Sequence, residues 1–402
     1  MTLTPIKRSG PAIAATVMLV GAIGACSSGG SPGGGDPTGP IKIELIGTIS
    51  SSAFSLPDVS AGAQAAVKEI NASGGVDGRK LSLTICNDQS DPNVAAACAR
   101  SAVQNGVAAV VGETSLVGSS IIPILQQADI ASIADVDISP IEHQSPVTFP
   151  ILTTGIAYAG LGPAMETAGC TKPAAISAHD PGQDDGIRWA FNYGSLRREN
   201  VYDQSVSSGA VDVTSPVEAV LSHGANCILL SGDSTSDPAM INAVRKLETG
   251  PVTLAVTPGA ITPQALASTA GGGQGVICAS MYYLSAEGAT PQYSEFIKSL
   301  KTQDPNLQPD QLAENAYNAV LLFKRAAIGL KTVDAKDILN AMDHLSNANT
   351  GLTISPVDFS KPSNVAGYQR LFAFGSQAYV FKSGAWTPEG TVENVSASLT
   401  NN

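Results

Sequence analysis

Short polar side chains and carboxylates follow two apolar runs in the first part of the chain. Thr114 and Ser115 come after the run at residues 107–113, and Asp135 and Asp137 come at and after the end of the run at 130–135. If these runs are parallel strands, their ends lie at the sheet edge where ligands bind. The hydroxyls could hold a ligand, or they could cap the next helix. Two carboxylates would suit a cationic or hydroxyl-rich ligand; alternatively, one caps a turn and the other faces solvent.

Further polar residues follow apolar runs later in the chain, at residues 173–180, 226–233 and 251–257. The Ser-rich loop at 50–58, after the run at 41–49, adds an aromatic residue that could line a cleft or pack in the core. We expect ligand contacts at these loops because free backbone N–H groups point outward there. The predicted ligand-binding set is Phe54, Ser55, Thr114, Ser115, Asp135, Asp137, Gln183, Asp184, Asp233 and Thr257.

The sequence lacks the spacing of serine, aspartate, histidine and cysteine residues that the common catalytic motifs require. The stretch SGDSTSD at 231–237 is similar to the nucleophile block of one esterase family, which also needs a later Asp-x-x-His. No histidine has an Asp three places before it, and Gly-x-Ser-x-Gly occurs only at residues 29–33, before the first strand. The sequence contains no phosphate loop, dinucleotide fingerprint or metal-ligand spacing of cysteines. We therefore expect a protein that is not an enzyme and has no cofactor or metal.

The first 40 residues are expected to lie outside the fold. Lys7 and Arg8 precede an apolar stretch, residues 11–25, that is too short to span a bilayer comfortably. The stretch ends before Cys26 in a pattern that resembles a bacterial lipobox, which implies cleavage after residue 25 and lipidation of Cys26. An ordinary signal peptide that contains a cysteine is the alternative. Residues 27–40, rich in Gly, Ser and Pro, indicate a flexible tether. We expect a body held on the extracytoplasmic face of the cell membrane.

Apolar runs alternate with helical patterns from residue 41 onward. Two such series, before and after residue 150, predict an α/β fold of two Rossmann-like lobes with parallel central sheets. The formal charge of −12, with no run of Lys or Arg, excludes a nucleic-acid-binding protein, which needs a basic face. Residues 368–386 are again β-like, and Gly375-Ser376 predicts a hairpin turn there.

The remaining five cysteines predict two disulfides, which an exported protein allows. Cys86 ends the second expected strand and Cys98 lies on the next helix. Cys170 and Cys227 each precede a strand, and those strands are neighbours if the second sheet has the order 2-1-3-4-5. Cys278 is then a buried thiol within a strand.

The stretch AVKEINASGGVDGRKLSLTICNDQSDPNVAAACARSAV, residues 66–103, resembles the first lobe of the type I periplasmic substrate-binding proteins. The branch in question contains the leucine/isoleucine/valine-binding proteins of ABC importers. The resemblance covers roughly residues 41–390 and includes LAENAYNAVLLF near the end. Its motif is carried by Ile70-Asn71, Gly74-Gly75, Gly78-Arg79, Asn87-Asp88, Ser90-Asp91-Pro92 and Val111-Gly112.

The resemblance implies a monomeric, lipid-anchored protein that captures an amino acid or related small polar molecule. Its partners would be the permease and ATPase subunits of an ABC importer. It also implies that Thr114 and Ser115 hold the substrate carboxylate. The chain departs from the amino-acid-binding relatives at Ala134–Asp137, and at Gln183, where an aromatic residue is often found. A ligand-sensing lipoprotein with a signalling partner, or an esterase-like hydrolase, are the alternatives.

The expected boundaries follow from this reading. Lobe I comprises residues 41–153 and 286–352, lobe II comprises 154–285 and 353–390, and residues 391–402 form a tail. Crossover strands near 151–156, 284–288 and 350–356 would form the hinge.

Overall fold

The computed structural model describes residues 39–399, except 52–54, 179–180, 258–260 and 308. Cys26 and Phe54 therefore lie outside the described residues. Within the described part of the chain, each helix is too short or too polar to cross a bilayer.

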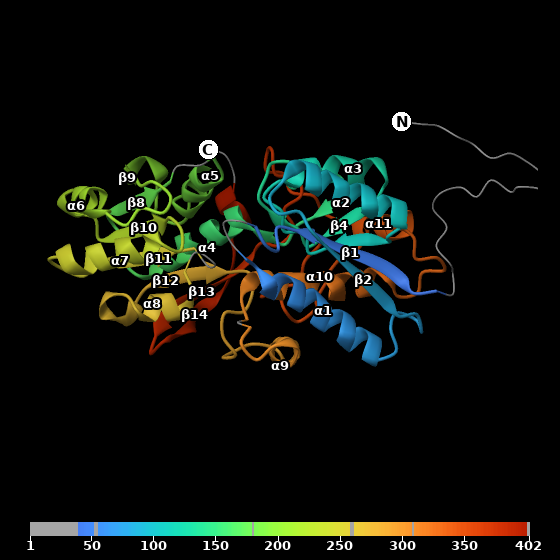
Figure 1. The fold of residues 1–402 in the computed structure, drawn as a ribbon. Helices are drawn as coiled ribbons and strands as arrows, with labels where there is room; N and C mark the ends of the chain where they lie inside the picture. Colours follow the sequence, from blue (N-terminus) through green and yellow to red (C-terminus); the bar gives the residue numbers. More distant parts are fainter. Residues whose placement is uncertain (1–38, 52–54, 179–180, 258–260, 308, 400–402) are drawn as a thin grey trace, which may run out of the picture. The chain divides into compact units, whose positions relative to one another are not determined.

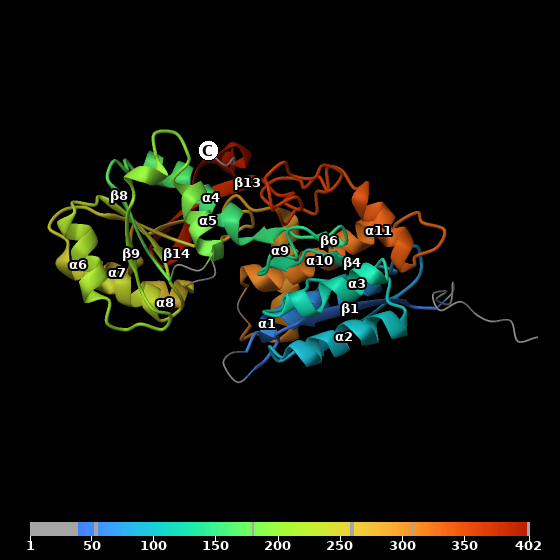
Figure 2. The same cartoon turned by 90° about the horizontal axis from the view of Figure 1, so that it is seen from above.

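The first sheet has five parallel strands in the order β2-β1-β3-β4-β6 (Figure 1). The strands are β1 (Ile41–Gly47), β2 (Leu81–Asn87), β3 (Ala109–Val111), β4 (Ala131–Ile133) and β6 (Thr148–Phe149). One core contains side chains of α1 (Pro57–Ala72), α9 (Pro291–Gln303) and α10 (Gln311–Ala327). A second core contains α2 (Pro92–Asn105) and α3 (Ile122–Gln127). Because helices cover both faces, most side chains of the central strands are buried, including the charged Glu44 of β1. The helix α11 (Ala335–Asp343) lies beside β4 (Figure 2).

Turns of this lobe are specified by local residues. The Asp91 side chain accepts hydrogen bonds from the backbone N–H groups of Asn93 and Val94 and so caps α2. After α1, Gly75 has a φ of +86°, and a Cβ there would lie 2.0 Å from the Arg79 carbonyl oxygen. Only glycine fits this position, which explains the Gly-Gly that ends the helix.

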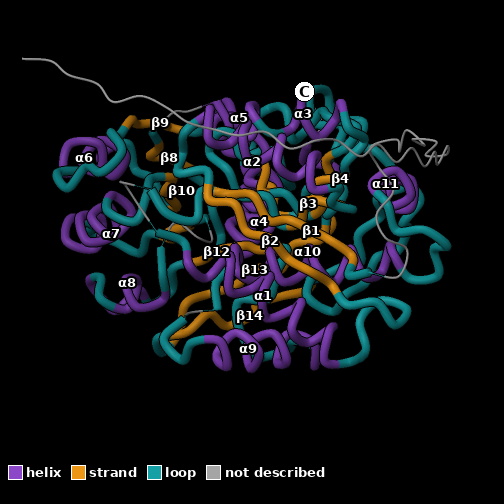
Figure 3. The backbone as a smooth tube through the Cα atoms, turned by 45° about the vertical axis from the view of Figure 1, so that its right-hand side comes forward, coloured by secondary structure: helices purple, strands orange, loops and turns teal. Residues whose placement is uncertain are grey.

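The second sheet has seven strands in the order β14-β13-β12-β11-β10-β8-β9. They are β8 (Pro173–Ser177), β9 (Tyr202–Ser205), β10 (Cys227–Ser231), β11 (Thr253–Val256), β12 (Ile277–Ser280), β13 (Gly375–Lys382) and β14 (Ala385–Asn394). The first five are parallel and confirm the predicted order 2-1-3-4-5. One face packs against α6 (Thr214–Ser222), α7 (Ser236–Leu247) and α8 (Pro263–Ala267), which follow one another along the sheet in Figure 3. The other packs against α4 (Thr154–Thr167) and α5 (Pro181–Ala190).

Both predicted disulfides are confirmed. Cys86 pairs with Cys98, and Cys170 pairs with Cys227, with Cα–Cα distances of 5.8 and 5.5 Å. The second bridge joins the segment before β8 to the first residue of β10, and the two strands are neighbours. Cys278 is a buried free thiol in β12, as expected.

The predicted hairpin turn at Gly375-Ser376 is wrong. Those residues begin β13, and the hairpin turns instead at Ser383 and Gly384, whose φ values are +52° and +85°. Two consecutive positive φ values give the turn that matches the strand twist of a two-residue hairpin. Gly375 has another role: a Cβ there would lie 2.1 Å from the Ser355 Oγ.

Part of residues 353–390, which are expected in the second lobe, contacts the first sheet. Phe359 and Phe372 contact Phe149 of β6. The β14 strand continues to Asn394, past the expected boundary at 390. Near the expected hinge, β5 (Val136–Asp137) pairs with β7 (Leu152–Thr153).

Candidate functional site

The loops at the carboxyl ends of β1, β2, β3 and β4 are joined by hydrogen bonds into one edge. The Thr48 N–H donates to the Thr114 carbonyl oxygen at 2.8 Å, and the Val136 N–H donates to the Glu113 carbonyl oxygen at 2.9 Å. The Thr48 hydroxyl donates to the Asp88 carboxylate at 2.7 Å. The residues that the sequence marked after β3 and β4 are therefore close together in space.

The hydroxyls of Thr114 and Ser115 are buried and support their own loop. Thr114 Oγ1 donates to the Gly112 carbonyl oxygen at 3.0 Å, and Ser115 Oγ accepts from the Val117 N–H at 3.0 Å. The neighbouring Leu116 side chain is 48% exposed. In this structure the two hydroxyls thus form local bonds of the capping kind, and an apolar side chain faces outward beside them.

Buried carboxyl groups lie beneath this edge. Glu113 and Asp135 are fully buried. Burial raises the pKa of Glu113 well above its ordinary value, and Glu142, Asp135 and Asp88 raise it further. Burial also raises the pKa of Asp135, although a hydrogen bond from the Ser132 hydroxyl opposes the shift. Asp135 therefore belongs to the interior of the lobe rather than to its solvent-exposed edge.

Ser55 and Asp137 are the two other described residues of the first lobe in the predicted ligand-binding set. Ser55 is exposed and pairs with Ser50 in an isolated bridge. The backbone of Asp137 ends β5, and its side chain lies outside what the structure describes.

At the second sheet, Asp233 joins two adjacent loops. It accepts hydrogen bonds from the Ser208 hydroxyl at 2.7 Å and the Gly209 N–H at 2.6 Å, after β9. It also accepts from the N–H groups of Thr235 and Ser236 at the start of α7. Partial burial raises the pKa of Asp233, but these hydrogen bonds outweigh it and hold the pKa well below its ordinary value. A carboxylate with this many partners positions loops.

The other predicted residues of this edge are more accessible. Gln183 is half-buried and its Oε1 accepts from the Ala178 N–H at 3.1 Å, which ties α5 to the end of β8. Asp184 is exposed and Thr257 is half-buried. In the block considered as a nucleophile, Ser234, the serine of Gly-Asp-Ser, is exposed. Ser231 is buried and shares a hydrogen bond with the Tyr158 hydroxyl.

Sequence reasoning missed the titration behaviour of Asp237, which lies in the first turn of α7. Its side chain is buried, Oδ1 accepts from the Gly232 N–H at 2.8 Å, and Oδ2 has no hydrogen-bond partner. Burial raises the pKa of Asp237 to about 7, with a smaller contribution from Asp233. The sequence SGDSTSD does not show that Asp237 is more buried than Asp233, because the burial that raises a pKa depends on tertiary packing.

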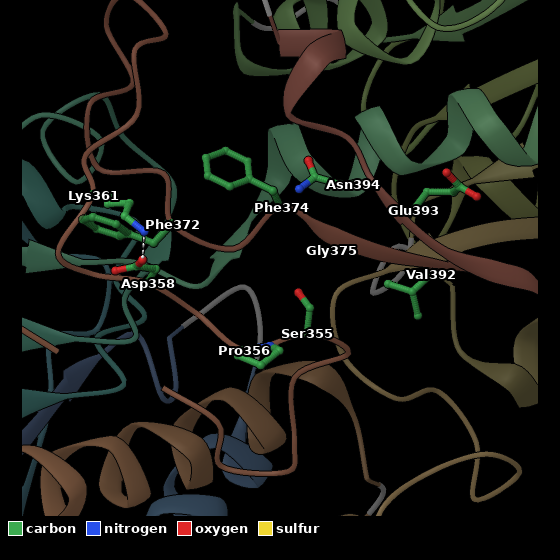
Figure 4. A pocket seen from close by; sticks show the side chains of 10 residues that line it. All are labelled: Ser355, Pro356, Asp358, Lys361, Phe372, Phe374, Gly375, Val392, Glu393 and Asn394. Atoms are coloured by element: carbon green, nitrogen blue, oxygen red, sulfur yellow. Dashed lines mark ion pairs between the residues drawn. The ribbon is translucent and has the colours of Figure 1, made fainter. Parts of the chain in front are cut away.

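A pocket of about 370 Å³ lies beside the start of β13 and the end of β14 and shares no residue with the predicted ligand-binding set (Figure 4). It is formed by parts of residues 355–361, 372–375 and 392–394. Across the described ranges, no group of three or more His, Cys, Asp or Glu side chains is placed to hold a metal ion.

Known proteins similar to this chain share one fold. Residues 40–373 match the family described as "Periplasmic binding protein". A segment of 73 residues is 37% identical to the Leu/Ile/Val-binding protein of Escherichia coli (strain K12), covering 18% of this chain and 20% of that protein. A segment of the same length is 41% identical to the leucine-, isoleucine-, valine-, threonine- and alanine-binding protein of Pseudomonas aeruginosa, with the same coverage. These matches span about a fifth of the curated relatives' length.

Solved structures extend the similarity over most of the chain. The branched-chain amino acid transporter substrate-binding protein of Streptococcus pneumoniae, in complex with isoleucine, superposes with a TM-score of 0.69 at 19% identity, over 88% of this chain and 99% of that one. The fatty acid ABC transporter substrate-binding protein of Thermomonospora curvata gives 0.72 at 17% identity, over 92% and 97%. At such identities the similarity establishes the fold, and the family match covers most of the residues. This chain belongs to the periplasmic binding protein family.

Proposed function

We propose that this protein captures a small molecule between its two lobes and delivers it to an ABC importer. The observation that carries the proposal is the family match over residues 40–373, together with two sheets whose parallel strands end in loops that bear polar groups. Similar proteins are named for branched-chain amino acids and, in one case, for a fatty acid. An amino acid or related compound is the first ligand class to test.

The proposed ligand-binding loops are those that carry Thr114 and Ser115 in the first lobe, and Gln183, Asp184 and Thr257 in the second. Ser55, Phe54 and Asp137 complete the set. Because Asp135 is buried and Asp233 is hydrogen-bonded to two loops, we assign both a positioning role. Ligand binding would favour a closed arrangement of the lobes by its higher affinity for that state.

We also propose that Cys26 carries a lipid that holds the mature protein on the extracytoplasmic face of the membrane. The proposal rests on the apolar stretch before Cys26 and the Gly/Ser/Pro-rich segment after it. A Cys26→Ser variant would be recovered in the soluble fraction, whereas the parent protein would partition with membranes and show a lipid adduct by mass spectrometry. Equal partitioning of both proteins would contradict the anchor.

The test of the binding function is thermal unfolding of residues 27–402 against a panel of small molecules. Branched-chain amino acids, amides, polyamines, sugars and fatty acids form the panel. A ligand that binds only the folded state, present at a concentration of about 100 times its Kd, stabilises that state by about 2.7 kcal/mol. Small-angle scattering with the ligand should then show compaction. A ligand that binds without compaction would contradict capture between the lobes.

A further inference from the structure

A series of hydrogen bonds leads from the loop after β4 into α10, the helix that contacts β3, β4 and β7. The Asn315 side chain donates from Nδ2 to the Ala134 carbonyl oxygen at 2.6 Å and accepts at Oδ1 from the Tyr282 hydroxyl at 2.6 Å. Asn318 lies on the same face of α10 as Asn315. It donates to the Tyr282 hydroxyl at 3.3 Å and accepts from the Thr350 hydroxyl at 2.6 Å. Each side chain therefore donates to the next, from Thr350 to Ala134.

Tyr282 belongs to a segment that leaves the second sheet. It follows β12, and its backbone N–H donates at 2.9 Å to the hydroxyl of Ser280, the last residue of that strand. It also forms an isolated antiparallel bridge with Thr353, which lies in the expected crossing segment at 350–356. The Tyr282 side chain thus joins two segments near the expected hinge to the loop after β4.

The loop residue that Asn315 contacts has an unfavourable backbone conformation. Ala134 has a φ of +55°, in the left-handed region that residues with a Cβ avoid. Such a residue persists where the surrounding structure holds it. The Ala134 N–H donates to the Phe149 carbonyl oxygen at 2.9 Å, and its carbonyl oxygen accepts from Asn315. Because Ala134 joins β4 to β5, its conformation sets the direction in which Asp135 and the residues after it leave the sheet.

The central members of this series are shielded from water. Tyr282, Asn315 and Asn318 are each 0% exposed. Burial raises the pKa of the Tyr282 hydroxyl well above its ordinary value, although the hydrogen bond from Asn318 opposes the shift, so the hydroxyl remains a donor. A buried polar group that loses its partner cannot turn to water instead. Removing one member should therefore disturb its neighbours in the series.

We propose that Asn315 and Tyr282 are positioning residues for ligand capture. Asn315 holds Ala134 in its left-handed conformation, and Tyr282 orients Asn315 from the crossing segment. Crossing segments absorb the backbone changes of hinge motion, so a movement of the lobes reaches the loop after β4 through these two side chains. The relevance to the ligand rests on the proposed function, in which Asp137 of the same loop belongs to the ligand-binding set.

Hydrogen–deuterium exchange of residues 132–139 in the folded, ligand-free protein is the test. Asn315→Leu keeps the branched shape of the side chain and removes both hydrogen bonds, so exchange there should rise about tenfold. Tyr282→Phe removes only the hydroxyl and should raise it about threefold. Tyr317→Phe is the matched control, because that hydroxyl on α10 donates to Glu69 of α1 and should leave exchange at 132–139 unchanged. Thermal unfolding verifies that each variant is folded.

Asn315→Asp distinguishes this specific hydrogen bond from a general loosening of the fold. A buried carboxyl has a raised pKa, so at about pH 5 its protonated form can donate to the Ala134 carbonyl oxygen as the amide does. The carboxylate that forms by about pH 8 cannot donate. Relative to the wild type at the same pH, exchange at 132–139 should be within about twofold at the lower pH and about tenfold faster at the higher one. Buried Glu314 and Asp135 titrate in both proteins, so the comparison is made at equal pH.

Three outcomes would overturn the proposal: equal effects of Tyr282→Phe and Tyr317→Phe, unchanged exchange in Asn315→Leu, or an Asn315→Asp ratio that does not vary with pH. If the Asn315 variants do not fold, the comparison of the two phenylalanine variants decides. Since the exchange measurement needs no ligand, failure here is distinguishable from failure of the binding function, which the panel of small molecules tests.

Discussion

The stability of this protein should fall as the pH rises through neutrality, and Asp237 should account for a measurable part of the loss. The folded state holds a proton on Asp237 up to about pH 7, because the side chain is buried and Oδ2 is unpartnered. The unfolded chain releases that proton near the ordinary value of 3.8. A raised carboxyl pKa therefore contributes stability that is present below the unfolded value and is lost as the pH rises through the folded value.

The expected magnitude follows from the width of that window. At about pH 5 the unfolded chain has already released the Asp237 proton, whereas the folded state keeps it up to about pH 7. The free energy of unfolding therefore falls over about two pH units between about pH 5 and about pH 8. At about 1.4 kcal/mol per unit, the free energy of unfolding falls by about 3 kcal/mol. Buried Glu44, with a pKa raised by burial to about 7, adds a loss of the same sign. The wild-type protein therefore loses more than Asp237 alone explains, and a variant must isolate the contribution.

Urea denaturation of the wild type, Asp237→Asn and Asp129→Asn at both pH values makes that comparison. Asn keeps the shape and the Oδ1 acceptor for the Gly232 N–H but does not titrate. Between the two pH values, the free energy of unfolding of Asp237→Asn should fall by about 3 kcal/mol less than that of the wild type. Asp129→Asn changes an exposed carboxylate and serves as the control, so its free energy of unfolding should fall as much as that of the wild type. A wild type equally stable at both pH values, or an Asp237→Asn variant with an undiminished loss, would refute the reasoning.

Three further outcomes are expected. Cys170→Ala/Cys227→Ala opens a loop of 57 residues and should lower the free energy of unfolding by about 4 kcal/mol, against about 3 kcal/mol for the bridge that closes 12 residues; urea denaturation showing the reverse order would contradict this. Gly62→Ala should cost about 1–3 kcal/mol, because its Cβ would lie 2.2 Å from the Ala313 carbonyl oxygen where α1 crosses α10; an unchanged melting temperature would show that the helices can separate without cost. Asp233→Asn should raise amide hydrogen exchange in the loop after β9 about tenfold, since charged hydrogen bonds are stronger than neutral ones; unchanged exchange would mean that the loop is held by other contacts.

Much of the fold could be predicted because it depends on local patterns. Alternating apolar runs and helical patterns indicated two parallel sheets, and the expected order of the second sheet placed Cys170 and Cys227 at neighbouring strands, where the structure joins them. The hairpin was misplaced because Gly-Ser looks like a turn in isolation. Gly375 instead permits close contact with Ser355, a residue remote from that turn. Residues 357–373 carry no strand or helix pattern, so the contacts of Phe359 and Phe372 with Phe149 of the first sheet could not be predicted from the sequence.

In the candidate site, too, some features could be predicted from local sequence and others depend on distant residues. By itself the sequence determined that polar residues follow the parallel strands, because strand ends and loop composition are local properties. Tertiary structure decided what those residues do. Asp135 turns inward and is buried, Asp233 joins two loops, and the Thr114 hydroxyl bonds to its own loop while Leu116 is left exposed. The physical reason is that the burial of a side chain, and with it the pKa and the available hydrogen bonds, depends on residues remote in the chain that no local pattern identifies.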